Sequence, residues 1–186
     1  MSLDWLKNCV SVDIEAAGPY PARYAMLSIG ACLVSDLQLS FYTELEPDRE
    51  AVEENALSVS GFSMQHLKSH GVAPADAMQA FAEWLHSSVP EQPIFVAFNA
   101  PFDWMYVNDY FHRYYGSNPF GHSAIDIKAL FLGYSGGEWK QTSMNAVNLK
   151  LGLDKPLSHH ALEDAQDQAR LFLKIIERIQ NEPPKE

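Results

Sequence analysis

Residues 8–15 read NCVSVDIE, an apolar strand that ends in two carboxylates separated by one residue. Successive side chains of a β-strand point to opposite faces, so Asp13 and Glu15 share a face while Ile14 turns into the core. Two ionised carboxylates held side by side at a buried strand end repel each other. Such a pair is tolerated where one group keeps a proton or where a cation lies between them. Further acidic residues that reach this strand end would therefore indicate a cation site.

The composition is that of an ordinary globular domain. The chain has 186 residues, of which 47% are hydrophobic and 20% charged, enough for one domain with a substantial core. We expect residues 1–180 to form this single domain, and residues 181–186, which contain two adjacent prolines, to be a frayed tail. No apolar run approaches the length of a membrane span, and the N-terminal residues lack the pattern of a signal peptide. Cys9 and Cys32 both lie in apolar runs, which favours buried free thiols and a cytoplasmic location.

The net charge of −11 argues against one common mode of nucleic-acid binding. A broad basic surface holds long duplexes because Lys and Arg side chains neutralise phosphates, whereas this chain has 13 such residues against 24 acidic ones. A compact site can instead hold a phosphodiester through metal ions. We therefore expect the nucleic-acid partner, if there is one, to be a short strand or a single-stranded end.

The order of the expected elements is typical of an α/β layered domain with a mixed sheet. Three strands come first, and short turns between them suggest an antiparallel meander. The strands are expected at residues 8–15, 25–34, 37–45, 93–98 and 123–125. Helices are expected at residues 53–59, 63–67, 74–87, 99–115, 126–132, 142–151 and 158–179.

Two later segments can bring carboxylates to the end of the first strand. Asp103 lies in the first turn of the helix after the strand at 93–98, the edge at which α/β sheets place ligands. Asp164 comes five residues after His159, about 500° of an ideal helix, which does not align the two side chains. His159 can still turn back towards Asp164 if it precedes the first helical turn. Asp126 is expected to cap a helix rather than to act as a further ligand.

Taken together, these segments resemble the DEDDh family of 3′–5′ exonucleases, which includes proofreading exonucleases, ribonuclease T and oligoribonuclease. The resemblance lies in DIE at residues 13–15, NAPFD at residues 99–103 and HHALEDA at residues 159–165. The corresponding family patterns are Asp-x-Glu, His-Asn-Ala-x-Phe-Asp and His-x-Ala-x-x-Asp-Ala. Any one of these motifs alone is a weak signal. Three motifs in the family order, on the expected strands and helices, are a specific signal for the family. The resemblance implies a ribonuclease H-like α/β fold, with a five-stranded mixed sheet flanked by helices.

The resemblance also implies a two-metal phosphodiester hydrolase. The implied metal ligands are Asp13, Glu15, Asp103 and Asp164, whose oxygens favour Mg²⁺ or Mn²⁺. His159 would be the general base that takes a proton from the attacking water. The implied substrate is single-stranded or short RNA or DNA with a free 3′ end, and the implied products are nucleoside 5′-monophosphates. A homodimer is expected by analogy with family members of this size.

The chain departs from the family pattern around the expected substrate. Ala16 and Ala17 replace a usual Thr pair, which removes a hydroxyl near the 3′ terminus. Ser60 replaces a His that can contact the terminal nucleotide, and Phe98 replaces a frequent His. We assign Ala16, Ser60 and Phe102 to substrate binding, with Phe102 as a ring that can stack on a base. The choice between RNA and DNA stays open.

Two alternative functions also stay open. The acidic composition is compatible with a phosphodiesterase for small substrates, such as dinucleotides or nucleotide-capped RNA ends. A non-catalytic module of the same fold that binds a partner protein is the second alternative. The complete set of four carboxylates together with His159 argues against this module.

Overall fold

The computed structural model describes residues 3–153 and 159–181, and these residues are built around a mixed sheet. The strands are β1 (Cys9–Ala16), β2 (Met26–Leu33), β3 (Ser40–Glu44), β4 (Ile94–Ala97) and β5 (Ala124–Asp126). Within the described residues they form one five-stranded sheet in the order β3-β2-β1-β4-β5. β1 pairs antiparallel with β2 and parallel with β4, which confirms the mixed sheet expected from the sequence.

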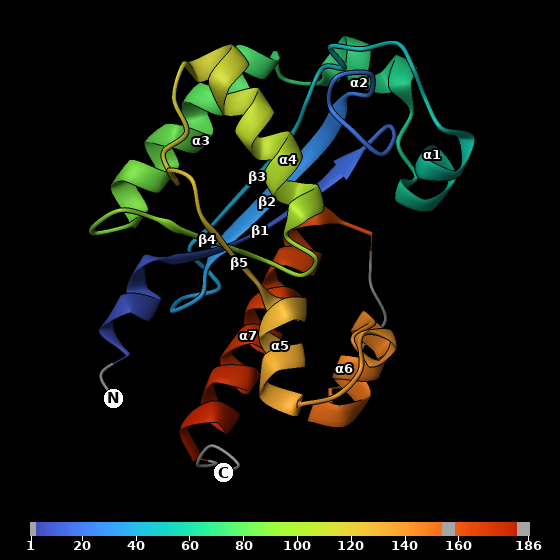
Figure 1. The fold of residues 1–186 in the computed structure, drawn as a ribbon. Helices are drawn as coiled ribbons and strands as arrows, with labels where there is room; N and C mark the ends of the chain where they lie inside the picture. The colour runs from blue at the N-terminus through green and yellow to red at the C-terminus, as the bar shows by residue number, and fades with distance from the viewer. Residues whose placement is uncertain (1–2, 154–158, 182–186) are drawn as a thin grey trace.

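Helices cover both faces of this sheet. The α-helices are α1 (Glu54–Ser60), α2 (Met64–His70), α3 (Pro74–Ser88), α4 (Pro101–Tyr110), α5 (Ile127–Ser135), α6 (Met144–Leu151) and α7 (Ala161–Asn181). Shorter pieces are 3-10 helices at Asp4–Asn8 and Trp139–Gln141 and a π-helix at Phe111–Tyr115 that continues α4. Figure 1 shows α3 and α4 on one side of the sheet, with α5, α6 and α7 on the other.

β1 alternates between two cores, and this alternation decides where its carboxylates point. Val10, Val12 and Ile14 belong to the core that includes residues of α3 and α4. Cys9 belongs to the core that includes residues of α5, α6 and α7. Because side chains on a strand alternate with a period of two, Asp13 is on the same face as Cys9 and points towards α7.

A glycine brings α7 close to the sheet beside Asp13. Gly30 of β2 pairs with Asp13 in the β1–β2 ladder. A Cβ atom at Gly30 would overlap with the backbone of Ala161 and Leu162, in the first turn of α7. Any larger residue at position 30 would therefore push the start of α7 away from the strand that carries Asp13.

The expected elements are confirmed, with small shifts at their ends. The third strand is shorter than the expected residues 37–45, and α2 continues three residues beyond the expected Leu67. The expected start of the last helix near Ser158 and the tail from residue 182 onward lie outside the described residues, and Asn181 ends α7. Among the helices that the structure describes, none combines the length and the apolar character that crossing a membrane requires.

Candidate active site

Four carboxylates from three separate elements meet at the C-terminal end of β1. Asp13 and Glu15 come from β1, Asp103 from the first turn of α4 and Asp164 from the first turn of α7. Asp103 and Asp164 are buried, and the other two are partly buried. The negative charges of the other three all act on Asp13, so the four groups form one electrostatic cluster. The structure thus brings together all the acidic residues that the sequence singled out.

The main chain holds two of these carboxylates in place. The N–H group of Ile14, which lies between the two acidic residues of β1, donates a hydrogen bond of 3.1 Å to Oδ1 of Asp103. The N–H group of His159 donates a hydrogen bond of 2.9 Å to Oδ2 of Asp164. Each carboxylate therefore meets a backbone donor from outside its own helix, which fixes its orientation.

His159 precedes α7 in an unusual backbone conformation. Its φ angle is 56°, in the left-handed region that non-glycine residues seldom adopt. This turn brings His159 close to Asp164, which the spacing of an ideal helix would not allow, because it folds the chain back over Asp164. A ring nitrogen of His159 and carboxylate oxygens of Glu15 and Asp164 lie within 4.8 Å of one another. The structure thus places His159 at the edge of the cluster, and its side chain is exposed.

Asp126 is a cap, as expected, and it also fixes the turn that leads into α4. Its Oδ1 atom accepts hydrogen bonds from the N–H groups of Asn99 (3.0 Å), Ala100 (3.3 Å) and Lys128 (3.1 Å). Asn99 lies in this turn with a left-handed φ angle of 62°. The turn and Pro101 at the start of α4 together direct Asp103 towards β1.

Burial and mutual repulsion raise the pKa values in the cluster. The pKa of Asp13 lies well above its ordinary range, first because the group is desolvated and second because of the charge of Asp103. Burial and the charge of Asp164 raise the pKa of Glu15 to about 7. Burial raises the pKa of Asp103 to about 8, against the opposing hydrogen bond from Ile14. The cluster therefore keeps protons near neutral pH unless cations replace them.

The chemistry of these donors fits divalent cations. Several carboxylate oxygens that converge at one point are the ligands that hard ions such as Mg²⁺ and Mn²⁺ prefer. A cation among them would remove the repulsion that raises their pKa values. Within residues 3–153 and 159–181, no group of three or more potential ligands other than Glu15, His159 and Asp164 is so close together.

Gln168 belongs to this site, although the sequence analysis did not single it out. It lies on α7 and is 3% exposed, and its Nε2 atom donates a hydrogen bond of 2.5 Å to Oδ1 of Asp13. A signal was present in the sequence, because a residue four positions after Asp164 lies on the same face of a helix.

A hollow of about 420 Å³ opens next to the carboxylates. Its lining contains Glu15 from the cluster, together with Ala16 and Phe102, two of the three residues assigned to substrate binding. Ser60, the third, is not part of the described lining, and its hydroxyl donates to the carbonyl oxygen of Ala56 within α1. The remaining lining residues, which the sequence analysis did not indicate, are Gly18, Pro19, Glu53, Asn55 and Ala56.

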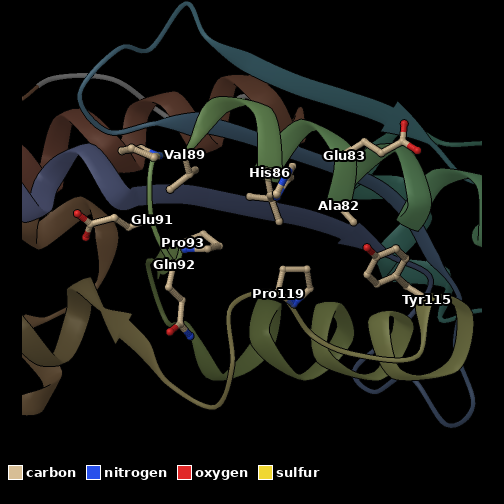
Figure 2. Close-up of a pocket in the computed structure, with 11 residues that line it drawn as sticks. Ala82, Glu83, His86, Val89, Glu91, Gln92, Pro93, Tyr115 and Pro119 are labelled. Carbon is tan, nitrogen blue, oxygen red and sulfur yellow. The ribbon is translucent and has the colours of Figure 1, made fainter.

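A second, larger hollow of about 890 Å³ lies away from the carboxylates. It runs between the C-terminal half of α3, the segment that leads to β4 and the loop around Pro119 (Figure 2). Its lining includes Leu85 and Val89, which belong to the buried core, and Figure 2 shows Glu83 and Glu91 well apart from each other. Its size alone does not make it a reaction site, because it lacks converging charged groups.

Comparisons with known proteins agree with this geometry. The family model described as Exonuclease, of the RNase T type, matches residues 10–172. The 3′–5′ DNA exonuclease Cap18 of Escherichia coli is 42% identical over 172 residues, which cover 91% of each chain.

Two solved structures share the fold. The nuclease domain of 3′hExo, a DEDDh family member bound to rAMP, superposes with a TM-score of 0.80 at 13% identity, covering 100% of this chain and 99% of that one. Pop2p of S. pombe, in a Mg²⁺- and Mn²⁺-bound form, has a TM-score of 0.69 at 18% identity, covering 94% of this chain and 85% of that one. The chain therefore belongs to the RNase T exonuclease family, with the fold of the DEDDh nucleases and a 3′–5′ exonuclease activity.

Proposed function

We propose that this exonuclease acts on single-stranded DNA and releases nucleoside 5′-monophosphates one at a time from the 3′ end. The observation that carries the proposal is the convergence of four carboxylates beside His159. The choice of DNA is supported by the DNA exonuclease that is 42% identical to this chain. The choice of a single strand is supported by the net charge of −11, which disfavours a long duplex lying across the surface.

The proposed metal ligands are Asp13, Glu15, Asp103 and Asp164, and the proposed ions are two Mg²⁺ or Mn²⁺. When bound, such ions supply Lewis-acid stabilisation for the charge that develops on the phosphate and acidify the attacking water. The residues of the chain contribute orientation, because Ile14 fixes Asp103 and the backbone of His159 fixes Asp164.

His159 is the proposed general base. Its imidazole lies at the exposed edge of the cluster, within 4.8 Å of Glu15 and Asp164, where a water can reach it. It takes a proton from the attacking water while the water oxygen bonds to phosphorus. The bond between phosphorus and the 3′ oxygen of the preceding nucleotide breaks, and this oxygen takes up a proton. The shortened strand then ends in a 3′ hydroxyl, and the released nucleotide keeps its 5′ phosphate.

The hollow beside Glu15 is the proposed place of the terminal nucleoside. Phe102 offers a partly buried ring on which a base can stack, and Ala16 leaves room where a larger side chain would stand. The volume of about 420 Å³ suits one nucleoside rather than several. Ser60 stays a predicted substrate contact that would have to act from the end of α1.

The test is a rate panel on 5′-labelled strands of single-stranded DNA, duplex DNA, RNA and a dinucleotide, each with Mg²⁺ or Mn²⁺. The proposal expects a ladder of shortened products and 5′-monophosphates, with single-stranded DNA cut at least about tenfold faster than RNA. Asp13→Asn should abolish this ladder, whereas Asp167→Asn, which changes a carboxylate of α7 that is paired with Arg170, should leave it in place. Faster cleavage of the dinucleotide or of RNA would overturn the choice of substrate, and 3′-monophosphate products would overturn the mechanism.

Three further properties belong to the same proposal. The cytoplasmic location is supported by Cys9 and Cys32, which are free and buried thiols suited to a reducing compartment. One domain over residues 1–180 is supported by α7, which packs across strands formed much earlier in the chain. The homodimer rests on analogy alone, and light scattering on the purified chain tests it directly.

A further inference from the structure

Gln168 links three elements at the base of the carboxylate cluster. From α7, its Oε1 atom accepts a hydrogen bond of 2.8 Å from the N–H group of Phe98, just after β4. Its Nε2 atom donates a hydrogen bond of 2.5 Å to Oδ1 of Asp13 on β1. The side chain is buried, so water is not available to replace either partner.

The two hydrogen bonds together fix which way the amide group of Gln168 points. A backbone N–H group can only donate, so the amide atom that faces Phe98 must be the carbonyl oxygen. The NH₂ group must then face Asp13, whose Oδ1 atom accepts its hydrogen bond. A half-turn of the amide would place donor against donor and acceptor against acceptor, so one orientation is strongly preferred.

We propose that Gln168 is a positioning residue that holds Asp13 in the orientation required for metal binding. This role rests on the proposed metal centre. Asp13 is exposed to the negative charges of Glu15, Asp103 and Asp164, which favour rotation of its carboxylate away from the cluster. The amide of Gln168 opposes that rotation with a fixed donor.

The choice of an amide has a chemical reason. A Lys or Arg at this position would also hold Asp13, but its positive charge would compete with a cation for the same carboxylate. Glutamine supplies the hydrogen bond without the charge. Gln168 thus does for Asp13 what the N–H group of Ile14 does for Asp103. Partners of this kind, which orient ligands without touching the metal, typically change metal affinity or activity by about 10–100-fold when removed.

A merely structural glutamine would tie α7 to Phe98 and have no effect on metal binding. Gln168→Met distinguishes the two roles, because methionine has a similar length but cannot bond Asp13 or Phe98. Gln166→Met is the matched control on the same helix, since Nε2 of Gln166 donates to the carbonyl oxygen of Leu37 at 3.0 Å. Both variants lose hydrogen bonding between α7 and the rest of the fold, but only Gln168→Met loses a contact with the carboxylate cluster.

The experiment is calorimetric titration of Mn²⁺ into the nucleic-acid-free protein, with melting temperature and steady-state kinetics on single-stranded DNA measured alongside. We expect the Kd for Mn²⁺ to rise about 10–100-fold in Gln168→Met and less than about twofold in Gln166→Met. In Gln168→Met, kcat should fall by a similar factor, while KM for DNA changes by less than about threefold. Gln168→Asn, which keeps the amide but is one methylene shorter, carries the same test if the methionine variant does not fold.

Two negative results have different meanings. Mn²⁺ binding by the parent chain together with unchanged affinity in both Gln168 variants would overturn the role of Gln168 and leave the metal centre standing. Absence of Mn²⁺ binding by the parent chain would overturn the metal centre itself, and the positioning role with it.

Discussion

Two of the hollows in this protein differ in a way that reverses what their sizes suggest. The larger one, about 890 Å³, is lined mainly by apolar side chains of α3 and the loops beside it. The smaller one, about 420 Å³, is lined by Glu15, which belongs to the cluster of four carboxylates from β1, α4 and α7. Catalysis needs charged groups held in a fixed arrangement, and only the smaller hollow has them.

The difference arises from how the two hollows are built. The larger hollow lies where the end of α3 and the following loops leave space beside the core. The smaller hollow lies beside groups fixed by long-range hydrogen bonds, such as those from Ile14 to Asp103 and from Gln168 to Asp13. Four predictions test this difference between the two hollows, and they are given in order of decreasing expected effect.

His159→Ala should lower kcat by about 10²–10⁴-fold, because it removes the proposed general base. KM for single-stranded DNA should change by less than about threefold, and the Kd for Mn²⁺ should change little. Steady-state kinetics and titration calorimetry measure both. His160→Ala is the matched control, since His160 is the adjacent histidine and its ring stacks on Tyr42 at 4.6 Å. A loss of Mn²⁺ affinity in parallel with kcat would instead identify His159 as a metal ligand.

Phe102→Ala should raise KM for single-stranded DNA by about tenfold, because stacking of a base on an aromatic ring contributes about 1–3 kcal/mol. The effect on kcat should be smaller, since Phe102 lines the hollow without joining the carboxylates. Phe102→Tyr keeps the ring and should behave like the parent chain. Equal KM values for the parent and the alanine variant would show that the terminal base does not stack there.

The metal-free protein should become less stable as pH rises from about 4 to about 8. The carboxyl groups of Glu15 and Asp103 have pKa values of about 7 and about 8 in the folded state. In the unfolded chain these pKa values lie near 4. Over this interval the folded state holds more protons, so the free energy of unfolding falls with rising pH.

Thermal melts in a chelator should accordingly give a lower Tm at pH 8.0 than at pH 5.5, and added Mn²⁺ should raise Tm more at pH 8.0. Asp103→Asn removes one of the titrating groups and should flatten the dependence. A Tm that stays constant or rises between these pH values would contradict the raised pKa values of Glu15 and Asp103.

Changes in the larger hollow should have the smallest effect. His86→Ala removes a polar side chain from its lining, and Tyr115→Ala removes an aromatic side chain that is 40% exposed. We expect kcat/KM on single-stranded DNA to stay within about twofold of the parent value for both. A tenfold loss, in a variant that melts at the parent temperature, would show that this hollow contributes to the nuclease activity.

The sequence predicted the architecture because its strongest patterns are local. The alternation along β1 separates Asp13 from Ile14, and the structure confirms the helix start that the capping residue Asp126 predicted. Asp13, Glu15 and Asp103 were found in the same way, by their places at a strand end and a helix start, whereas Asp164 was added by the resemblance to the exonuclease family. Their convergence follows from the topology of the sheet rather than from any one segment.

Two parts of the site could not be predicted from such local patterns. The relation between His159 and Asp164 depends on one left-handed residue, and helical spacing alone argued against it. The role of Gln168 depends on what α7 packs against, and its partner Asp13 lies 155 residues away in the chain. Neither a single backbone angle nor a distant packing partner is visible in local periodicity.

That separation of 155 residues also has a consequence for biosynthesis. A chain growing from its N-terminus can pair β1 with β2 and add the other strands before α7 has been made. It then carries Asp13, Glu15 and Asp103, but neither His159 nor Asp164. Interrupted synthesis, or cleavage ahead of α7, therefore leaves a protein with most of its sheet and no complete nuclease site. The complete site therefore forms only after α7 has been made.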